Sequence, residues 1–365
     1  MADALILGGG LAGSAAACLI ARDGKHVSLL ERETGPHHKV CGEFLSIEAV
    51  GHLHQLGVDP LALGAVPIER IRVVQGHHDV EAALPFTALG LSRFTLDEAL
   101  IAKAETYGAH VERGVRVLEL SGRTARTTRG EREGRRVLLA TGKLPVREQG
   151  VVLSGRAEDG FVGFKMHYRL TPAAARQLAG TIVLALFDGG YAGLQLVEDE
   201  RANLCLILRR KTFSQLGGDW TAVRGWFESN PVLQRILADG DALFEKPVAV
   251  ANLTYGLPSR DHAEGPALSL GDRWAMTPSL TGDGMAIALR SAFLAAQCVL
   301  SEADAASYHR RLAAQTRRQI TRAMVLQNGL ESSALRFAAY WLARLHPPLL
   351  TRAAHATRLP AWNEA

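Results

Sequence analysis

The sequence predicts an α/β protein: a Rossmann-like nucleotide-binding domain, interrupted by a second domain with an antiparallel sheet and followed by a helical C-terminal segment. Three observations predict this fold. A glycine-rich turn follows an apolar strand at residues 4–7, four strand-like stretches succeed one another between residues 161 and 208, and much of the chain after Ser301 has a helical pattern. With 365 residues, 47% of them hydrophobic, the chain is long enough for two domains and a sizeable core.

The first turn, Gly8-x-Gly10-x-x-Gly13, has the spacing of a dinucleotide-binding loop between a buried strand and a helix. In such a loop Gly8 makes the tight turn, Gly10 lets the backbone approach a pyrophosphate, and Gly13 permits close contact between helix and strand. The phosphates then lie at the N-terminus of the helix. The small residues at positions 12–18 allow that helix to pack tightly against the strand.

A second strand, at residues 26–30, ends in Glu31, 18 residues after Gly13. A carboxylate at this place accepts hydrogen bonds from ribose hydroxyls. A methyltransferase, a nicotinamide enzyme, or a glycine-rich turn without any ligand has the same pair of features. The turn and the carboxylate alone therefore leave the cofactor open.

Composition excludes several classes of protein. A net charge of +4 is too small to indicate nucleic-acid binding, and no basic segment precedes the apolar N-terminal run as in a signal peptide, so we expect a cytoplasmic protein. The cysteines are too far apart for a disulfide framework or a zinc site, and we expect no metal. They are Cys18, Cys41, Cys205 and Cys298.

The C-terminal segment is rich in arginine close to Trp341, Leu342, Leu345 and Leu349. Such charges usually form a solvated helix face, and the apolar neighbours leave peripheral contact with a membrane as the alternative. The arginines are Arg310, Arg311, Arg317, Arg318, Arg322, Arg336, Arg344, Arg352 and Arg358.

The remaining elements follow from periodicity. Up to residue 142 we expect helices at 46–56 and 95–107 and strands at 68–74, 80–84, 109–111, 115–120 and 137–142. Thr95 and Glu98 have capping-box spacing, which places the start of the second helix at Thr95. The later elements are strands at 161–170, 181–187, 191–197, 203–208 and 267–270 and helices at 220–228, 231–237 and 284–300.

The alternation of strands and helices stops after residue 142 and returns at the strand 267–270, so the first domain is predicted to be discontinuous. The predicted boundaries are residues 1–66, 91–150 and 266–300 for the first domain, 67–90 and 151–265 for the second, and 301–365 for the helical segment.

Four separated motifs now occur together: Gly8-x-Gly10-x-x-Gly13 with Glu31, Arg93-x-x-Leu96-Asp97, Ala140-Thr141-Gly142, and Gly271-Asp272 with Pro278 and Gly282-x-Gly284-Met285. This combination resembles the flavoprotein family that includes para-hydroxybenzoate hydroxylase, geranylgeranyl reductases and flavin-dependent halogenases. The resemblance covers most of the chain up to about Leu300. It implies an FAD-dependent oxidoreductase, with FAD in the first domain and substrate against the second.

The resemblance implies a role for each motif. Glu31 would bind the adenosine ribose, Arg93 the pyrophosphate or ribityl chain, and Asp272 the same groups, while the backbone of Val117 would lie beside the adenine. Amides at residues 282–285 would face the flavin pyrimidine oxygen, because a helix N-terminus stabilises negative charge on the reduced ring. The implied cofactor residues are Gly8, Gly10, Ala12, Gly13, Glu31, Arg32, Cys41, Arg93, Val117, Thr141, Gly142, Asp272, Gly282, Gly284 and Met285.

For two of these the residues themselves leave an alternative open. Asp272 is of a residue type that commonly caps a helix or turn, and Arg93 is of a type that is commonly solvated at the start of a helix.

Catalytic residues are less well specified, and the candidates are Cys41, His167 and Tyr191. Residues 39–46 resemble the segment that geranylgeranyl reductases place beside the isoalloxazine, so Cys41 would touch flavin or substrate. His167 is on a strand that in this family roofs the substrate pocket, and Tyr191 follows a glycine pair. The alternatives without a catalytic role are a buried loop thiol for Cys41, an ordinary sheet residue for His167 and a hairpin turn at Tyr191.

Two departures from the family limit what it implies. Thr141-Gly142 stands where aromatic hydroxylases have an Asp-Gly motif linked to nicotinamide binding, which puts direct reduction by NADPH or NADH in doubt and leaves a separate reductase as the alternative donor. The tryptophan-bearing signature of halogenases is not visible, so chlorination is not expected.

The leading hypothesis is a monooxygenase that hydroxylates a hydrophobic small molecule in secondary or lipid metabolism. The alternatives are a flavin-dependent reductase that saturates a carbon–carbon double bond and a flavin-binding redox partner without turnover.

Overall fold

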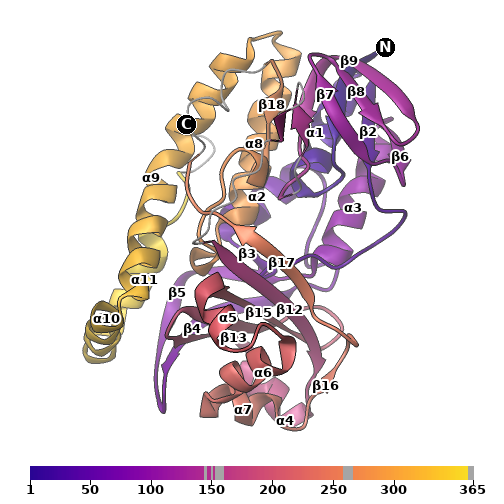
Figure 1. Ribbon diagram of the computed structural model, residues 1–365. Helices are drawn as coiled ribbons and strands as arrows, with labels where there is room; N and C mark the ends of the chain where they lie inside the picture. Colours follow the sequence, from indigo (N-terminus) through magenta and orange to yellow (C-terminus); the bar gives the residue numbers. More distant parts are fainter. Residues whose placement is uncertain (144–145, 149–150, 153–159, 258–265, 361–365) are drawn as a thin grey trace.

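The computed structural model describes residues 1–143, 146–148, 151–152, 160–257 and 266–360, which form two large sheets with helices around them (Figure 1). Residues 150 and 265, at which two of the predicted domain boundaries fall, lie outside these ranges.

The first sheet has a parallel centre in which β1 lies between β2 and β9. The strands of this centre are β1 (Ala2–Leu7), β2 (Val27–Glu31), β6 (His110–Arg113), β9 (Gly130–Leu139) and β18 (Leu268–Ser269). Residues 4–7 are fully buried, as expected for a parallel strand that is covered on both faces. The carboxyl ends of these strands therefore meet at one edge, where ligands bind in folds of this type.

An extension that is antiparallel except for the parallel β10–β7 pairing continues this sheet beyond β9. It contains β7 (Val117–Ser121), β8 (Thr124–Thr127), β10 (Arg147–Glu148) and β11 (Val151–Val152). The sequence pattern did not predict β8 or the first half of β9, because these strands are polar and largely outside the core.

Four helices pack together beside the parallel strands, and α1 and α3 contact these strands directly. Helix α1 (Leu11–Arg22) packs between α3 (Arg93–Thr106) and α8 (Gly284–Leu300), and α2 (Ile47–Gln55) packs against α8. The predicted start of α3 at Thr95 is wrong. The helix begins two residues earlier, because the Ser92 hydroxyl accepts a hydrogen bond from the Thr95 backbone N–H at 3.1 Å.

Among the described strands the second sheet is antiparallel, as predicted, except at one pairing. Strand β13 runs parallel to β4, because the β4–β5 hairpin comes from a distant part of the chain. The strands of this sheet are β3 (Phe44–Leu45), β4 (Val66–Gln75), β5 (His78–Gly90), β12 (Phe161–Arg169), β13 (Gly180–Phe187), β14 (Gly190–Leu196), β15 (Arg201–Arg209), β16 (Asp241–Ala242) and β17 (Val248–Leu253).

The two faces of the second sheet have different partners, since side chains alternate along each strand. On β13, Val183 and Ala185 pack in one core with the helices that cover one face of the sheet, whereas Leu184 and Leu186 belong to the opposite face. The helices are α4 (Pro172–Leu178), α5 (Arg210–Gln215), α6 (Trp220–Glu228) and α7 (Pro231–Leu237).

The C-terminal segment forms three helices, α9 (Ala305–Glu331), α10 (Ser333–Leu345) and α11 (Pro348–Ala356). Helix α9 runs beside α8, while α10 and α11 lie against β5 of the second sheet (Figure 1). The segment therefore bridges both sheets. None of the helices in the described ranges is both long and apolar enough to cross a membrane.

Candidate active site

The first glycine turn is closed by backbone contacts that only glycine allows. A Cβ on Gly8, which has φ +113°, would lie 2.4 Å from the Ala140 carbonyl oxygen, and a Cβ on Gly13 would lie 1.9 Å from the Gly8 carbonyl oxygen. Gly10 is the N-cap residue of α1 and makes no side-chain cap. The N-terminus of α1 is therefore open to a ligand.

Glu31 is fixed at the edge of this turn. Its Oε2 accepts a hydrogen bond from the Gly9 backbone N–H at 2.7 Å, and its Oε1 accepts one from the Glu33 N–H at 2.9 Å. The side chain is buried, and it lines the cavity described below. The carboxylate keeps lone pairs that can accept further hydrogen bonds.

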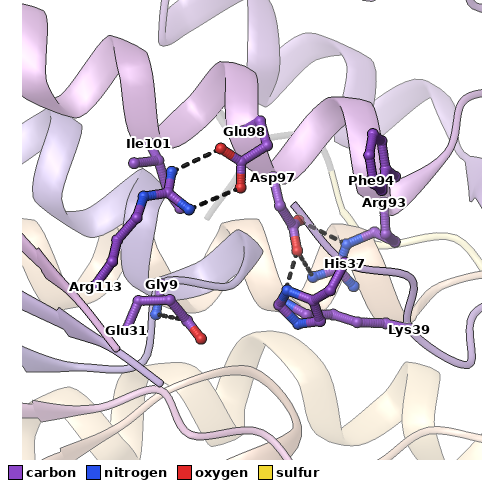
Figure 2. A pocket seen from close by; sticks show the side chains of 10 residues that line it. All are labelled: Gly9, Glu31, His37, Lys39, Arg93, Phe94, Asp97, Glu98, Ile101 and Arg113. Atoms are coloured by element: carbon purple, nitrogen blue, oxygen red, sulfur yellow. Dashed lines mark hydrogen bonds and ion pairs between the residues drawn. The ribbon is translucent and has the colours of Figure 1, made fainter. Parts of the chain in front are cut away.

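Two cations converge on the same turn and are held by one carboxylate. Asp97 accepts from Lys39 Nζ at 2.7 Å and from Arg93 Nε at 2.7 Å, as Figure 2 shows. Although burial opposes it, the charges of Arg93 and Lys39 hold the pKa of Asp97 below its usual range. An added Cβ at Gly10 would lie 3.5 Å from Lys39 Nζ and 3.6 Å from Arg93 Nη2. A helix N-terminus and two cations therefore face one point, which suits a diphosphate.

A second ion pair closes the outer side of this region. Arg113 donates from Nη1 to Glu98 Oε1 at 3.0 Å and from Nη2 to Glu98 Oε2 at 2.6 Å. Figure 2 shows this pair beside Glu31 and Gly9. Glu98 thus pairs with a strand residue instead of completing the capping box expected from the sequence.

The turn opens into a cavity of about 990 Å³ that reaches the second sheet and the C-terminal helices. Its far half is apolar. Sheet residues lining that half are Ile71, Val73, Leu84, Phe86, Ile182, Leu184 and Leu186, and helix residues are Leu326, Leu330, Ala339, Leu342, Ala343, Leu349, Leu350, Ala353 and Ala354. The volume is at the upper end of the range of small-molecule sites, about 300–1,000 Å³.

The remaining sequence motifs border the middle of this cavity. Asp272 lies 3.2 Å from Lys143 Nζ, and Thr141 and Gly142 line the wall where β9 ends. Gly282 has φ +70°, and a Cβ there would lie 2.6 Å from Phe44 Cδ1. The N-terminus of α8 therefore opens into the cavity with no room for a side chain at Gly282.

Comparison with known proteins agrees with this geometry. Residues 6–63 match the model of an NAD(P)-binding Rossmann-like domain. The structure superposes on a flavin-dependent brominase, Bmp2, with TM-score 0.78, 16% identity and coverage of 98% of this chain and 93% of that chain. It superposes on PqsL, a probable FAD-dependent monooxygenase from Pseudomonas aeruginosa, with TM-score 0.71, 17% identity and coverage of 93% and 99%.

The chain has the fold of FAD-dependent oxidoreductases. The resemblance predicted from the sequence is confirmed, as is the α/β fold class with its helical C-terminus. A menaquinone reductase of Mycobacterium tuberculosis is 34% identical over 122 residues, 32% of this chain. The aligned part spans only 30% of that relative's length.

In this flavoprotein fold, the structure brings the predicted cofactor residues together around one cavity. All of the 15 residues named above line it except Gly13, which instead packs α1 against the Gly8 turn. Arg93 is not a solvated residue, since only 14% of its side chain is exposed. Asp272 makes no side-chain cap and pairs with Lys143.

The three catalytic candidates differ in position. Cys41 and Tyr191 line the cavity. His167 does not roof it, because its side chain is fully buried and its Nε2 lies 2.8 Å from Glu43 Oε2. The Tyr191 hydroxyl is buried next to Tyr255 and Ser279, and burial raises the pKa of Tyr191 well above its usual value.

The sequence did not single out Glu43, which organises the loop next to Cys41. Glu43 has φ +57° and a fully buried carboxylate that pairs with Lys165 and His167 and accepts from the Arg93 N–H at 2.8 Å. Despite desolvation, the His167 hydrogen bond and the Lys165 charge lower the pKa of Glu43. Lys165 and His167 are 122 and 124 positions away from Glu43 in the chain, so no local sequence pattern indicates that they pair with it. Only the fold reveals this contact.

Lys39 and Arg358 also contact the site without having been predicted to do so. Lys39 was part of the segment compared with the reductases, but its pairing with Asp97 places it at the diphosphate end. Arg358 belongs to the C-terminal segment, which the sequence analysis kept outside the cofactor domain, yet it lines the cavity.

Proposed function

We propose that this chain binds FAD and is an FAD-dependent oxidoreductase acting on a hydrophobic small molecule. The observation that carries the proposal is the single cavity, which has a charged helix N-terminus at one end and an apolar lining at the other. The residues fit the cofactor, because the turn leaves no room for a side chain at Gly8 or Gly13 and the two cations beside Gly10 complement a diphosphate.

In this proposal the first sheet holds the cofactor and the second sheet covers the substrate. Glu31 would accept from the ribose, and Lys39 and Arg93 would bind the diphosphate together with the α1 N–H groups. The N–H groups at the start of α8 would lie beside the flavin, where a helix N-terminus favours negative charge. When bound, FAD supplies the redox chemistry, and the protein orients substrate and excludes water.

The substrate would lie along the apolar half of the cavity, between β4, β5 and β13 on one side and α10 and α11 on the other. The Tyr191 and Thr277 hydroxyls both line the cavity, and the Thr277 hydroxyl makes no hydrogen bond within the described ranges. We assign the Thr277 hydroxyl to an oxygen of the substrate or of the flavin, since a buried hydroxyl without a partner is costly. Cys41 is placed to touch flavin or substrate.

Hydroxylation of the substrate is the reaction we favour, supported by the structural likeness to a probable monooxygenase. Saturation of a carbon–carbon double bond is the alternative, supported by the sequence likeness to a menaquinone reductase. Either NADPH or NADH would reduce the flavin directly, or a separate reductase would supply the electrons. The second option stays open because Thr141 replaces the expected acidic residue.

The cavity opens between α10 and α11, where Leu342 and Leu349 line it and are also 54% and 37% exposed. Further exposed apolar side chains occur on α9 and α10, namely Val325, Leu335, Phe337 and Leu345. We propose that the protein is cytoplasmic and that this rim of the cavity binds a membrane surface, where neighbouring arginines are attracted to acidic lipids. The cavity would then receive a lipophilic substrate from the membrane.

The first test is the visible absorption spectrum of the purified protein, recorded anaerobically before and after NADPH. The proposal expects a flavin band, and its absence after reconstitution with FAD would refute it. Mass spectrometry of the product then separates a gain of one oxygen from a gain of two hydrogens. Binding without turnover under any electron donor would instead support a redox partner.

A further inference from the structure

The C-terminal segment returns to the cavity after α11 and inserts Arg358 beside the start of α8. Arg358 Nη2 donates to the Thr281 carbonyl oxygen at 2.6 Å and pairs with the Asp283 carboxylate. Its Nε donates to the Ala354 carbonyl oxygen at 3.1 Å, and its guanidinium lies 5.1 Å from the centre of the Phe86 ring. Only 9% of the side chain is exposed.

Asp283 is the other half of this contact. It is the N-cap residue of α8, but its side chain makes no cap, and its carboxylate is fully buried. Burial raises the pKa of Asp283 to about 7, which the Arg358 charge opposes. The carboxylate thus faces the arginine and not the helix, so the helix N–H groups stay available.

Residues 281–284 are therefore held from two sides. Phe44 occupies the space next to Gly282, where an added Cβ would be 2.6 Å from Cδ1. Arg358 binds the Thr281 carbonyl oxygen, which precedes Gly282, and the Asp283 carboxylate, which follows it. Glu48 Oε2, 3.9 Å from Arg358 Nη1, is the other acidic group beside the guanidinium.

We propose that Arg358 is a positioning residue for the flavin: it fixes the turn at residues 281–284 so that the first N–H groups of α8 face the reduced ring. This inference rests on the proposed FAD binding. Because these N–H groups stabilise the negative charge of reduced flavin, the orientation of the turn sets the reduction potential. The C-terminal segment is then part of the redox site, although the cofactor motifs end at Met285.

The test compares Arg358→Gln with Arg322→Gln in the full chain. Arg322 also donates to a carbonyl of the C-terminal segment, Ala356 at 2.8 Å, but it does not touch the turn. Arg358→Gln should lower the flavin reduction potential and weaken FAD binding about tenfold, as expected for losing charge-assisted bonds. Arg322→Gln should leave both close to wild type.

Asp283→Asn provides an independent variant in case Arg358→Gln folds poorly. It removes the same ion pair from the other side, so the shift in potential of the double variant should be smaller than the sum of the two single shifts. Equal effects of Arg358→Gln and Arg322→Gln, or additive shifts, would overturn the positioning role. These two results test only the role of Arg358, because they are measured on protein that retains FAD. If the chain binds no FAD, the proposed function itself is refuted.

Discussion

The diphosphate end and the substrate end of the cavity are built in different ways. At the diphosphate end, backbone turns and paired charges fill the space, and Lys39, Arg93 and Asp97 hold each other within 2.9 Å. At the substrate end, apolar side chains from β4, β5, β13, α9, α10 and α11 surround open volume. The first end is crowded and charged, whereas the second is open and apolar.

The difference shows where each end is vulnerable. A rigid, charge-paired end fails when a single atom is misplaced or a charge is lost. An apolar end loses affinity gradually, because each contact contributes a small and similar amount. The following predictions test this contrast from the largest effect to the smallest.

Gly13→Ala should abolish FAD binding and lower the free energy of unfolding by at least about 3 kcal/mol, because the new Cβ would overlap the Gly8 carbonyl oxygen at 1.9 Å. Thermal unfolding and retained flavin measure this. Gly51→Ala in α2, where an added Cβ meets nothing within 4 Å, is the matched control and should be neutral or slightly stabilising. Equal behaviour of the two variants would contradict the close contact.

Glu43→Gln should lower the free energy of unfolding by about 3–5 kcal/mol, because it leaves Lys165 buried without a counter-charge. Urea unfolding of the apoprotein at pH 7 measures the loss. Glu81→Gln, which breaks the exposed pair with Arg72, should cost at most about 1 kcal/mol.

The effect of Glu43→Gln should also depend on pH. Since the pKa of Glu43 is lowered in the folded protein, its stabilisation is present above the unfolded value and is lost as the pH falls through the folded one. The gap between wild type and variant should therefore close in acid. A gap that widens in acid would rule out this assignment.

Arg93→Gln should weaken FAD binding by about 10- to 100-fold, the equivalent of one or two charge-assisted hydrogen bonds, while leaving substrate affinity of the FAD-loaded protein unchanged. Fluorescence titration of the apoprotein with FAD measures this. Arg126→Gln, at the exposed pair with Glu119, serves as the control and should leave the affinity unaltered.

Leu350→Ala should raise KM for the hydrophobic substrate about tenfold without altering FAD affinity, because it removes apolar contact from the far end of the cavity only. Steady-state kinetics and FAD titration on the same preparation separate the two effects. A loss of FAD with no change in KM would show that the two ends are not independent.

Asp283→Asn should change the pH dependence of stability with a sign opposite to that of Glu43→Gln. Because the folded pKa of Asp283 is raised to about 7, the group favours the folded state below its unfolded pKa of 3.8 and loses this contribution as the pH rises toward 7. The variant should remove that downward slope from the unfolding free energy between these values. An unchanged slope would assign it to other groups.

The sequence by itself determined the α/β class and the helices α6, α7 and α8 at their observed bounds, and it singled out the first glycine turn. These features are local. The glycine turn spans only residues 8–13, and helical or alternating periodicity is visible within one element. For the same reason, Gly8, Gly10 and Glu31 could be selected from the residues alone.

Tertiary structure decided the rest, because the decisive contacts join positions far apart in the chain. It alone set the parallel β13–β4 pairing, the burial of Glu43 with Lys165 and His167, and the return of Arg358 to the start of α8. It also decided that Ser92, and not Thr95, caps α3. The apolar half of the cavity has no motif, since it exists only where the second sheet and the C-terminal helices meet across unfilled space.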